Sequence, residues 1–318
     1  MITLDHVYIL LGLLFAGFAI LSARDRTNAK RLGNVAFWGL LAASFSFGTY
    51  LGDFANGVLV LALVVLGGFG ALGRGRPDTT SAEERRRSAL RRGNWLFLPA
   101  LLIPAVTLLG ALFLKRASID GVSLVDAKQV TLVSLALGVL LALGVAMIWL
   151  RPPVLAPLQE GRRMIDAVGW AVILPQLLAS LGAIFTLAGV GHAIGILATH
   201  YIPLDLPIAA VTVYCVGMAL FTMIMGNAFA AFPVMTAAIG LPLIVHKFGG
   251  NPAIMGSIGM LSGFCGTLVT PMAANFNIVP AALLELPDRN AVIKVQIPTA
   301  IPLLAANTLL MYFLVFRF

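Results

Sequence analysis

The chain has 318 residues, of which 60% are hydrophobic and only 11% charged, and its mean hydropathy is +0.98. A soluble domain carries about 25% charged residues, so the composition excludes an ordinary soluble protein and predicts an all-α, polytopic membrane protein. The formal net charge of +8 does not indicate nucleic-acid binding, because the basic residues lie in short loops between apolar runs. Two cysteines, Cys215 and Cys265, provide neither a disulfide framework nor the spacing of metal ligands.

The first part of the chain contains apolar runs long enough to cross a bilayer, which takes roughly 20 residues. They cover residues 4–22, 33–51, 55–73, 94–114, 129–150 and 166–188. The first run has no basic segment before it and no clear cleavage site after it. We therefore expect it to remain in the mature protein rather than to act as a signal peptide.

The basic residues between these runs predict the orientation of the chain. Fourteen of the 21 lysines and arginines lie in the loops after the first, third and fifth runs. The loop between the fourth and fifth runs contains only three, Lys115, Arg116 and Lys128. The positive-inside rule therefore predicts that the N-terminus lies outside the cell and the loop 74–93 in the cytoplasm.

The loop 74–93 has a local structure of its own. Ser81-Ala-Glu-Glu84 is the pattern of a capping box and precedes an arginine-rich run. We expect a short basic helix on the inner membrane surface, which either contacts anionic lipid or a partner or simply orients the chain. The preceding Gly68-Phe-Gly-Ala-Leu-Gly73 spells GxGxxG, but it follows a predicted membrane helix and not a strand, so we exclude a dinucleotide site.

After residue 188 the apolar runs are interrupted more often by polar residues, glycines and prolines. Residues 189–205 contain His192 and His200 and predict an interfacial connector, too interrupted for a span. Residues 206–245 predict either two full spans or one re-entrant hairpin with Gly226-Asn227 at its tip.

The remaining chain predicts a discontinuous helix and a last crossing. Residues 252–287 are too long for one straight span, and GFCGTLVTPMAANFNI (263–278) predicts a helix broken between Gly263 and Asn277. The run 292–316 predicts the final crossing. The expected fold therefore has about eight crossings, a re-entrant hairpin and one discontinuous helix.

A broken helix at membrane depth is tolerated only where it is buried in protein or lines a wet cavity. Secondary transporters use such breaks to hold anionic substrates at helix N-termini and cations at freed carbonyls. Glycines allow unwinding and close approach, and a proline frees a carbonyl. The alternative is that these residues only pack helices together, as in a Gly259-xxx-Gly263 pattern. We take as candidate substrate- or ion-binding residues Gly226, Asn227, Gly266, Thr267, Thr270, Pro271, Asn275 and Asn277.

The charges of this region bear on the coupling ion. No Asp or Glu occurs from Leu206 to Leu284, and Lys247 is the only lysine or arginine there. A proton relay normally uses Asp, Glu or His, whereas neutral oxygens at a helix break can hold sodium. The pattern favours a sodium ion at the same break and predicts no other cofactor or metal. A partner chain could still supply a carboxylate for proton coupling.

Three stretches resemble a known family. They are LPQLLASLGAIF (174–185), GMALFTMIMGNAFAAFPVM (217–235) and GMLSGFCGTLVTPMAANFNIVPAALLEL (259–286). They resemble the larger membrane subunit of the bacterial 5-oxoproline transporter, in the ion-transporter superfamily. The resemblance is tightest over residues 166–316. It implies a bacterial inner-membrane location, a second, smaller membrane subunit, and a substrate that is a small cyclic amide with one carboxylate.

Superfamily members contain two inverted repeats, each with a hairpin and a broken helix. This chain shows one such pair and resembles half a transport unit with a scaffold. We therefore expect a scaffold-type region 1–165 and a transport-type region 166–318. The predicted function is that of a subunit of a secondary transporter for a small carboxylate. One alternative is a scaffold whose partner holds the whole site. Another is an intramembrane enzyme, which the lack of HExxH, GxSxG or paired membrane carboxylates argues against.

Overall fold

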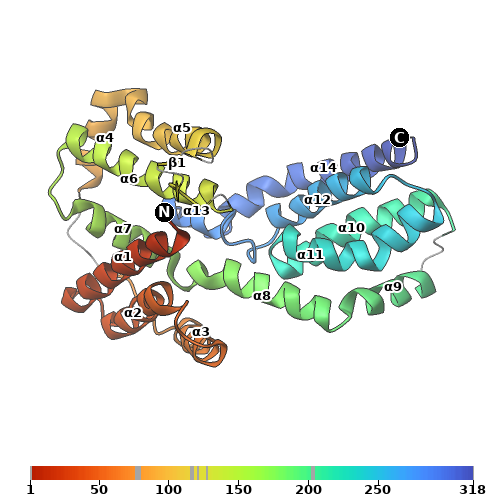
Figure 1. The fold of residues 1–318 in the computed structure, drawn as a ribbon, viewed down its shortest axis with the longest axis horizontal. Helices are drawn as coiled ribbons and strands as arrows, with labels where there is room; N and C mark the ends of the chain where they lie inside the picture. The colour runs from red at the N-terminus through yellow and green to blue at the C-terminus, as the bar shows by residue number, and fades with distance from the viewer. Residues whose placement is uncertain are drawn as a thin grey trace. The chain divides into compact units, whose positions relative to one another are not determined.

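The computed structural model of the protein describes residues 2–75, 80–114, 118–119, 122–126, 128–201 and 205–317. Arg76, Lys115 and Arg116, which entered the charge comparison above, lie outside this set. The chain divides into two compact units, Met1–Asp166 and Ala167–Phe318. Nearly all the secondary structure of the described residues is helical (Figure 1).

The helices have the length and composition of membrane spans. Within the described residues, seven are long and apolar enough to cross a bilayer. These are Leu4–Arg24, Glu83–Phe113, Val130–Leu150, Ala156–Leu187, Pro207–Met225, Ala228–Lys247 and Ala291–Val315. The predicted fold class is therefore confirmed, and the protein is an all-α, multi-pass membrane protein.

The first unit begins with three helices, α1 (Leu4–Arg24), α2 (Arg31–Phe47) and α3 (Asp53–Gly68). The helices α2 and α3 have 17 and 16 residues, fewer than the roughly 20 expected of a span. The predicted runs 33–51 and 55–73 are thus longer than the helices they form. The predicted side of the loop 74–93 does not depend on this difference. Whether α2 and α3 each cross the membrane or form one re-entrant pair, the chain returns to the same side.

The second half of this unit is a packed pair of helices, α5 (Phe97–Phe113) and α6 (Val130–Leu150). Between them, the two-residue strands β1 (Ser118–Ile119) and β2 (Val122–Ser123) pair antiparallel. The unit ends in α7 (Ala156–Val168), whose last two residues belong to the second unit.

The predicted capping box in the loop 74–93 is confirmed. Ser81 is the N-cap of α4 (Ala82–Arg92): its hydroxyl accepts from the Glu84 N–H at 3.2 Å, and its own N–H donates to the Glu84 carboxylate at 2.8 Å. At Gly93 (φ +52°) the chain leaves α4 and passes through η1 (Gly93–Leu96) into α5.

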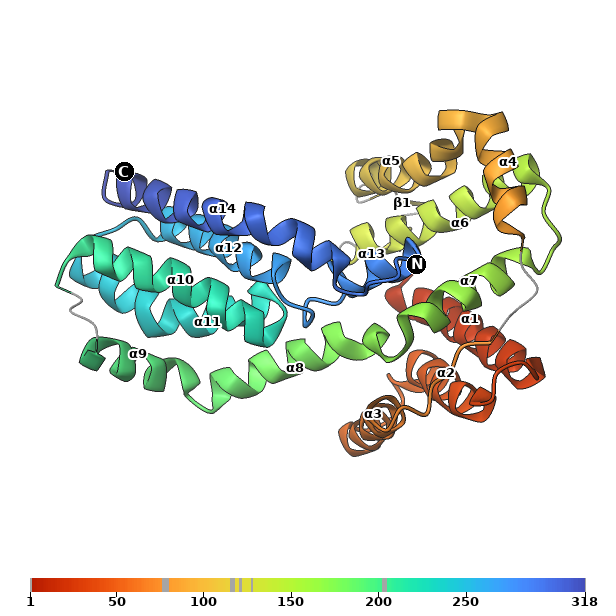
Figure 2. The same ribbon diagram turned by 180° about the vertical axis from the view of Figure 1, so that it is seen from behind.

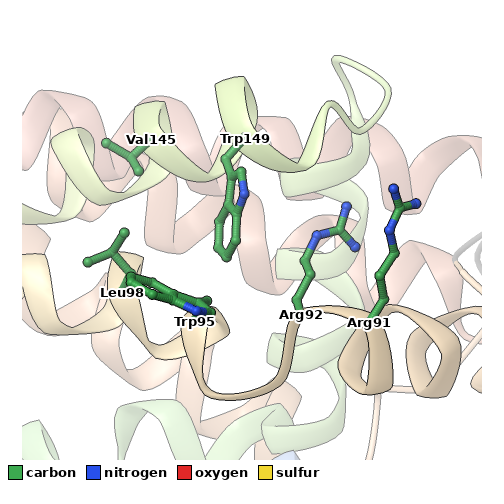
Figure 3. A pocket seen from close by; sticks show the side chains of 6 residues that line it. All are labelled: Arg91, Arg92, Trp95, Leu98, Val145 and Trp149. Atoms are coloured by element: carbon green, nitrogen blue, oxygen red, sulfur yellow. The ribbon is translucent and has the colours of Figure 1, made fainter.

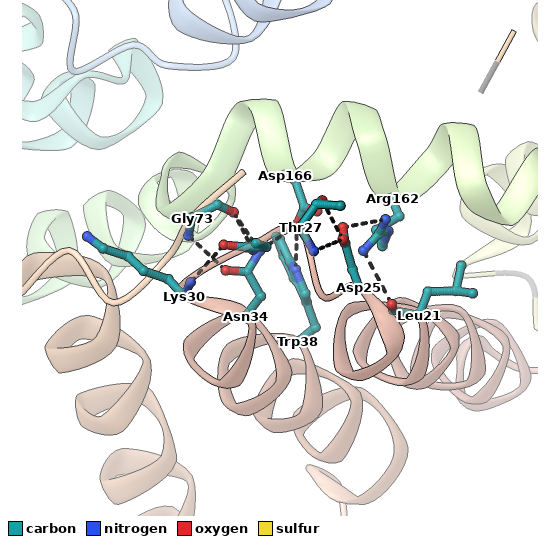
Figure 4. A network of polar contacts seen from close by, with 10 residues as sticks. Leu21, Asp25, Thr27, Lys30, Asn34, Trp38, Gly73, Arg162 and Asp166 are labelled. Carbon is teal, nitrogen blue, oxygen red and sulfur yellow. Dashed lines mark hydrogen bonds and ion pairs between the residues drawn. The ribbon is translucent and has the colours of Figure 1, made fainter. Parts of the chain in front are cut away.

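A buried ion pair joins the end of α1 to α7 (Figure 4). The guanidinium of Arg162 donates to the Asp25 carboxylate at 3.0 Å and to the Leu21 carbonyl at 3.3 Å. The two side chains of the pair are only 5% and 7% exposed. Burial raises the pKa of Asp25, but hydrogen bonds from Thr27 and Arg162 outweigh it, so the pKa lies below its ordinary value.

A second set of contacts ties α2 to α7 and to the segment before α4. Trp38 Nε1 and Asn34 Nδ2 both donate to Asp166 Oδ1, at 2.9 and 3.0 Å (Figure 4). Asn34 also exchanges two hydrogen bonds with the backbone of Gly73. Sequence reasoning missed this network, although the isolated Asp166 at the start of a predicted span was a signal for it.

The second unit opens with η3 (Gly169–Ile173), α8 (Leu174–Leu187) and α9 (Val190–Tyr201). Residues 189–205, predicted as an interfacial connector too interrupted for a span, contain α9, whose 12 residues are fewer than the roughly 20 of a membrane span. A Cβ at Gly191 would lie 2.9 Å from the carbonyl oxygen of Val234, and a Cβ at Gly195 would lie 2.9 Å from that of Ala238. These two glycines therefore let α9 pack closely on the neighbouring helix.

The rest of the unit is built on α10 (Pro207–Met225), α11 (Ala228–Met235), the π-helix η4 (Thr236–Lys247), α12 (Pro252–Leu268), α13 (Ile278–Leu283) and α14 (Ala291–Val315). Both views show α12 beside α14, and α10 beside α11 (Figure 1 and Figure 2). Tyr214, Met218, Met255 and Met311 form the buried core between these helices.

Candidate functional site

The chain turns between α10 and α11 at Gly226-Asn227, the position predicted either for the turn between two full spans or for the tip of a re-entrant hairpin. Gly226 adopts φ +68°, in the left-handed region that favours glycine. The next residue, Asn227, is the N-cap of α11, and its Oδ1 accepts from the Phe229 N–H at 2.8 Å. Both arms, Pro207–Met225 and Ala228–Lys247, are long enough to cross a membrane.

The discontinuity in the next helix is shorter than the sequence predicted. The helix α12 continues to Leu268 and α13 begins at Ile278, so the break spans residues 269–277. Gly263 and Gly266 lie inside α12, and the expectation that they unwind it is wrong. A Cβ at Gly263 would lie 2.9 Å from Met218 Cε, and a Cβ at Gly266 would clash with the Ala219 carbonyl. Both glycines therefore allow α12 to pack against α10.

Asn277 and Thr270 hold the break in place. The fully buried Asn277 donates from Nδ2 to the carbonyl oxygens of Thr267 and Thr270, at 2.8 and 2.6 Å. Thr270 Oγ1 donates to the Met223 carbonyl at 2.8 Å and accepts from the Met272 N–H at 3.2 Å. These side chains satisfy backbone groups that a continuous helix would pair by itself. Asn277 Oδ1 is left buried without a hydrogen-bond partner among the described residues, as is Thr222 Oγ1.

The hairpin tip, the break and the start of α8 line one cavity of about 90 Å³. Four of the predicted site residues line it: Gly226, Asn227, Thr267 and Asn275. The other four, Gly266, Thr270, Pro271 and Asn277, are not part of the lining. The cavity wall contains no charged side chain, so any charge on a ligand would be met by amides, hydroxyls and backbone groups.

The two asparagines of the break have different surroundings. Asn277 is buried and fixed by its hydrogen bonds, whereas Asn275 is exposed and its side chain forms no hydrogen bond with any described residue. Asn227 uses only one of its two side-chain polar groups. Its Oδ1 caps α11, whereas its Nδ2 has no hydrogen-bond partner among the described residues. The amides of Asn227 and Asn275 are therefore the polar groups available to a ligand in the cavity.

Apolar residues complete the cavity wall, and sequence reasoning missed them. They are Pro175, Leu178, Ala228, Phe229, Phe264, Met272 and Phe276. The rings of Phe229 and Phe264 lie edge to face, with centroids 5.9 Å apart. Nothing distinguishes such residues locally from the many other apolar residues of the chain. A second hollow of about 270 Å³ between α8 and α11 shares Asn227 and Phe229 with the cavity.

The comparisons with known proteins place the chain in a family. Residues 5–316 match the model of the family described as "Protein of unknown function (DUF979)". The chain belongs to this family. Comparison with curated proteins and with solved structures finds no match.

Proposed function

We propose that this protein is a subunit of a secondary transporter for a small carboxylate. The sequence resemblance points to 5-oxoproline as the substrate and to the bacterial inner membrane as the location. The observation that carries the proposal is that a helical-hairpin tip and a helix break, 40 or more residues apart in sequence, line the same cavity. Secondary transporters bind their substrates at interrupted membrane helices.

The cavity has the chemistry to receive a carboxylate without a basic side chain. The first residues of α11 form part of its wall, and a helix N-terminus carries a partial positive charge. The free amides of Asn227 and Asn275 add hydrogen-bond donors. The rings of Phe229 and Phe264 offer apolar contact to the remainder of a small ring compound.

The volume of the cavity supports the need for a partner. At about 90 Å³ it is well below the roughly 300–1,000 Å³ of ordinary ligand pockets. This chain would therefore hold the carboxylate end of the substrate, and the smaller membrane subunit implied by the resemblance would complete the site.

Neutral oxygens near the break support sodium as the coupling ion. Asn277 Oδ1 at the break and Thr222 Oγ1 in the neighbouring helix α10 are buried oxygens without a partner among the described residues. A buried acceptor normally has a hydrogen-bond donor, a water molecule or an ion against it. Sodium is held by neutral oxygens at helix breaks in other secondary transporters.

The decisive experiment is uptake of radiolabelled 5-oxoproline into vesicles that contain this chain, with and without the membrane protein encoded beside it. We expect uptake only when both chains are present, and stimulation by an inward sodium gradient. Uptake by this chain alone would disprove the need for a partner. Normal uptake by complexes with both Asn227 and Asn275 substituted would support the alternative that this chain is a scaffold. Chemical conversion of the substrate would instead indicate an enzyme.

A further inference from the structure

The first unit contains a larger hollow, of about 400 Å³, where α4, η1 and α5 meet the end of α6 (Figure 3). Its lining combines two arginines, two tryptophans and two aliphatic residues: Arg91, Arg92, Trp95, Leu98, Val145 and Trp149. No acidic side chain contributes to it. The hollow is therefore electropositive on one side and apolar on the other.

Arg92 is held in position by its contacts, and neither Arg91 nor Arg92 is neutralised. The helix α4 ends at Arg92, and both arginines extend from it toward the end of α6 (Figure 3). The Arg92 guanidinium lies 5.9 Å from the centroid of the Trp149 ring and donates to the Ser88 hydroxyl at 2.7 Å. Neither Arg91 nor Arg92 forms an ion pair with any described residue. Their charges remain available to an anion.

The position of the hollow along the spans matches the level of lipid headgroups. It lies at the N-terminal end of α5 and the C-terminal end of α6, and tryptophans are enriched at this level of a bilayer. Trp95 is 70% exposed. Only 6% of the most apolar part of the span Glu83–Phe113 is buried within the chain. Acyl chains can therefore continue from Leu98 along the exposed apolar surface of α5.

We propose that this hollow binds one anionic phospholipid, with the headgroup phosphate between Arg91 and Arg92. Guanidinium groups form strong, paired hydrogen bonds with phosphate oxygens. The indole rings of Trp95 and Trp149 pack against the glycerol region, and Leu98 and Val145 contact the start of the acyl chains. The predicted cytoplasmic position of the loop 74–93 places the site in the leaflet where basic pockets between helices bind anionic headgroups.

The test is a titration of the purified full-length chain in neutral detergent with phosphatidylglycerol or phosphatidylcholine, read by native mass spectrometry. We expect one phosphatidylglycerol to bind in preference to phosphatidylcholine. The double variant R91Q/R92Q should lose about 5-fold in affinity per arginine, roughly 25-fold in all. Trp95→Leu should also weaken binding while leaving the melting temperature unchanged, because the side chain is largely exposed.

The matched control is R86Q/R87Q, which removes the same charge from the same helix but outside the hollow. It should bind phosphatidylglycerol like the wild type. Equal losses in both double variants would show diffuse attraction to the basic helix and would overturn the site. Displacement of the lipid by millimolar inorganic phosphate would also overturn the site. The same holds if a photo-reactive aromatic residue in place of Trp95 cross-links to a protein and not to lipid.

Discussion

The side-chain amide of Asn277 donates a 2.6 Å hydrogen bond to the backbone carbonyl of Thr270, across the break between α12 and α13. The same amide also reaches the Thr267 carbonyl at 2.8 Å. One side chain thus replaces backbone donors that are missing where the helix ends. The break can persist among buried residues because its carbonyls are satisfied in this way.

Asn277→Ala should therefore destabilise the protein. The substitution leaves two buried carbonyls without their donor, at about 1–3 kcal/mol for each orphaned group. Asn277→Asp should be similarly harmful, because an ionised carboxylate cannot donate. Thermal unfolding in detergent measures the loss, with Asn275→Ala as the matched control. A wild-type melting temperature for Asn277→Ala would contradict the assigned role.

Asn275→Ala should weaken substrate binding without affecting assembly, because this amide lines the cavity and supports no backbone group. The loss of one hydrogen bond to a charged group costs about 1.5–3 kcal/mol, or roughly a 10- to 150-fold loss in affinity.

Asn227→Asp provides a second and sharper test of the cavity. It keeps the acceptor that caps α11 but replaces the Nδ2 donor by a charge that repels a carboxylate. Complex yield should remain normal while binding of 5-oxoproline falls. Unchanged affinity in well-assembled complexes of both Asn275→Ala and Asn227→Asp would place the substrate elsewhere.

Gly226→Ala should disturb the contact between the hairpin tip and the break. An added Cβ would lie 2.5 Å from the Met272 carbonyl oxygen. Gly249 has nearly the same backbone conformation (φ +70°), but a Cβ there meets nothing within 4 Å. Gly249→Ala should therefore cost only the roughly 1–2 kcal/mol of a left-handed residue. Gly226→Ala should cost about 1–3 kcal/mol more through overpacking. Equal melting temperatures of the two variants would show that the tip can move freely.

Asp25→Asn should strongly destabilise the first unit, because it leaves the buried guanidinium of Arg162 unpaired. Breaking a buried pair costs about 3–5 kcal/mol. In contrast, Glu83→Gln removes an exposed partner of Arg87 and should cost no more than about 1 kcal/mol. Comparable losses for the two variants in chemical or thermal unfolding would contradict the structural importance of the buried pair.

The ion pair between Asp25 and Arg162 also predicts that the stability of the first unit depends on pH. Because the folded pKa of Asp25 lies below its ordinary value of 3.8, the contribution of the ionised carboxylate is fully present above that value. It is lost as the pH falls further, through the folded pKa. Unfolding measured from about pH 5 down to about pH 2 should show a steeper acid loss for the wild type than for Asp25→Asn.

The predicted orientation can be tested with single cysteines at exposed positions on the two predicted sides. Glu83→Cys, in the basic helix, should resist a membrane-impermeant maleimide in intact cells. Lys128→Cys, before α6, should react with it. The native Cys215 and Cys265 are both buried and should contribute little background. The reverse pattern of labelling would invert the topology.

The sequence alone was sufficient for features that depend on neighbouring residues. Long apolar runs predict most of the helices. Ser81 and Glu84 predict the start of α4, because a capping box is formed within four residues. The hairpin tip was also predictable, since glycine tolerates the left-handed conformation and asparagine is a favoured N-cap.

Only the tertiary structure separated residues of the same type into different roles. Gly263 and Gly266 looked like points of unwinding, yet α10 lies so close to them that they serve as packing positions inside a continuous helix. Asn275 and Asn277 were equivalent in the sequence. In the structure Asn275 lines the cavity, whereas the side-chain amide of Asn277 is hydrogen-bonded to backbone carbonyls. Asp166 contacts Asn34 across 132 positions of the chain. Local patterns determine where a helix starts and ends, whereas the role of a small or polar side chain depends on which distant backbone atoms packing brings against it.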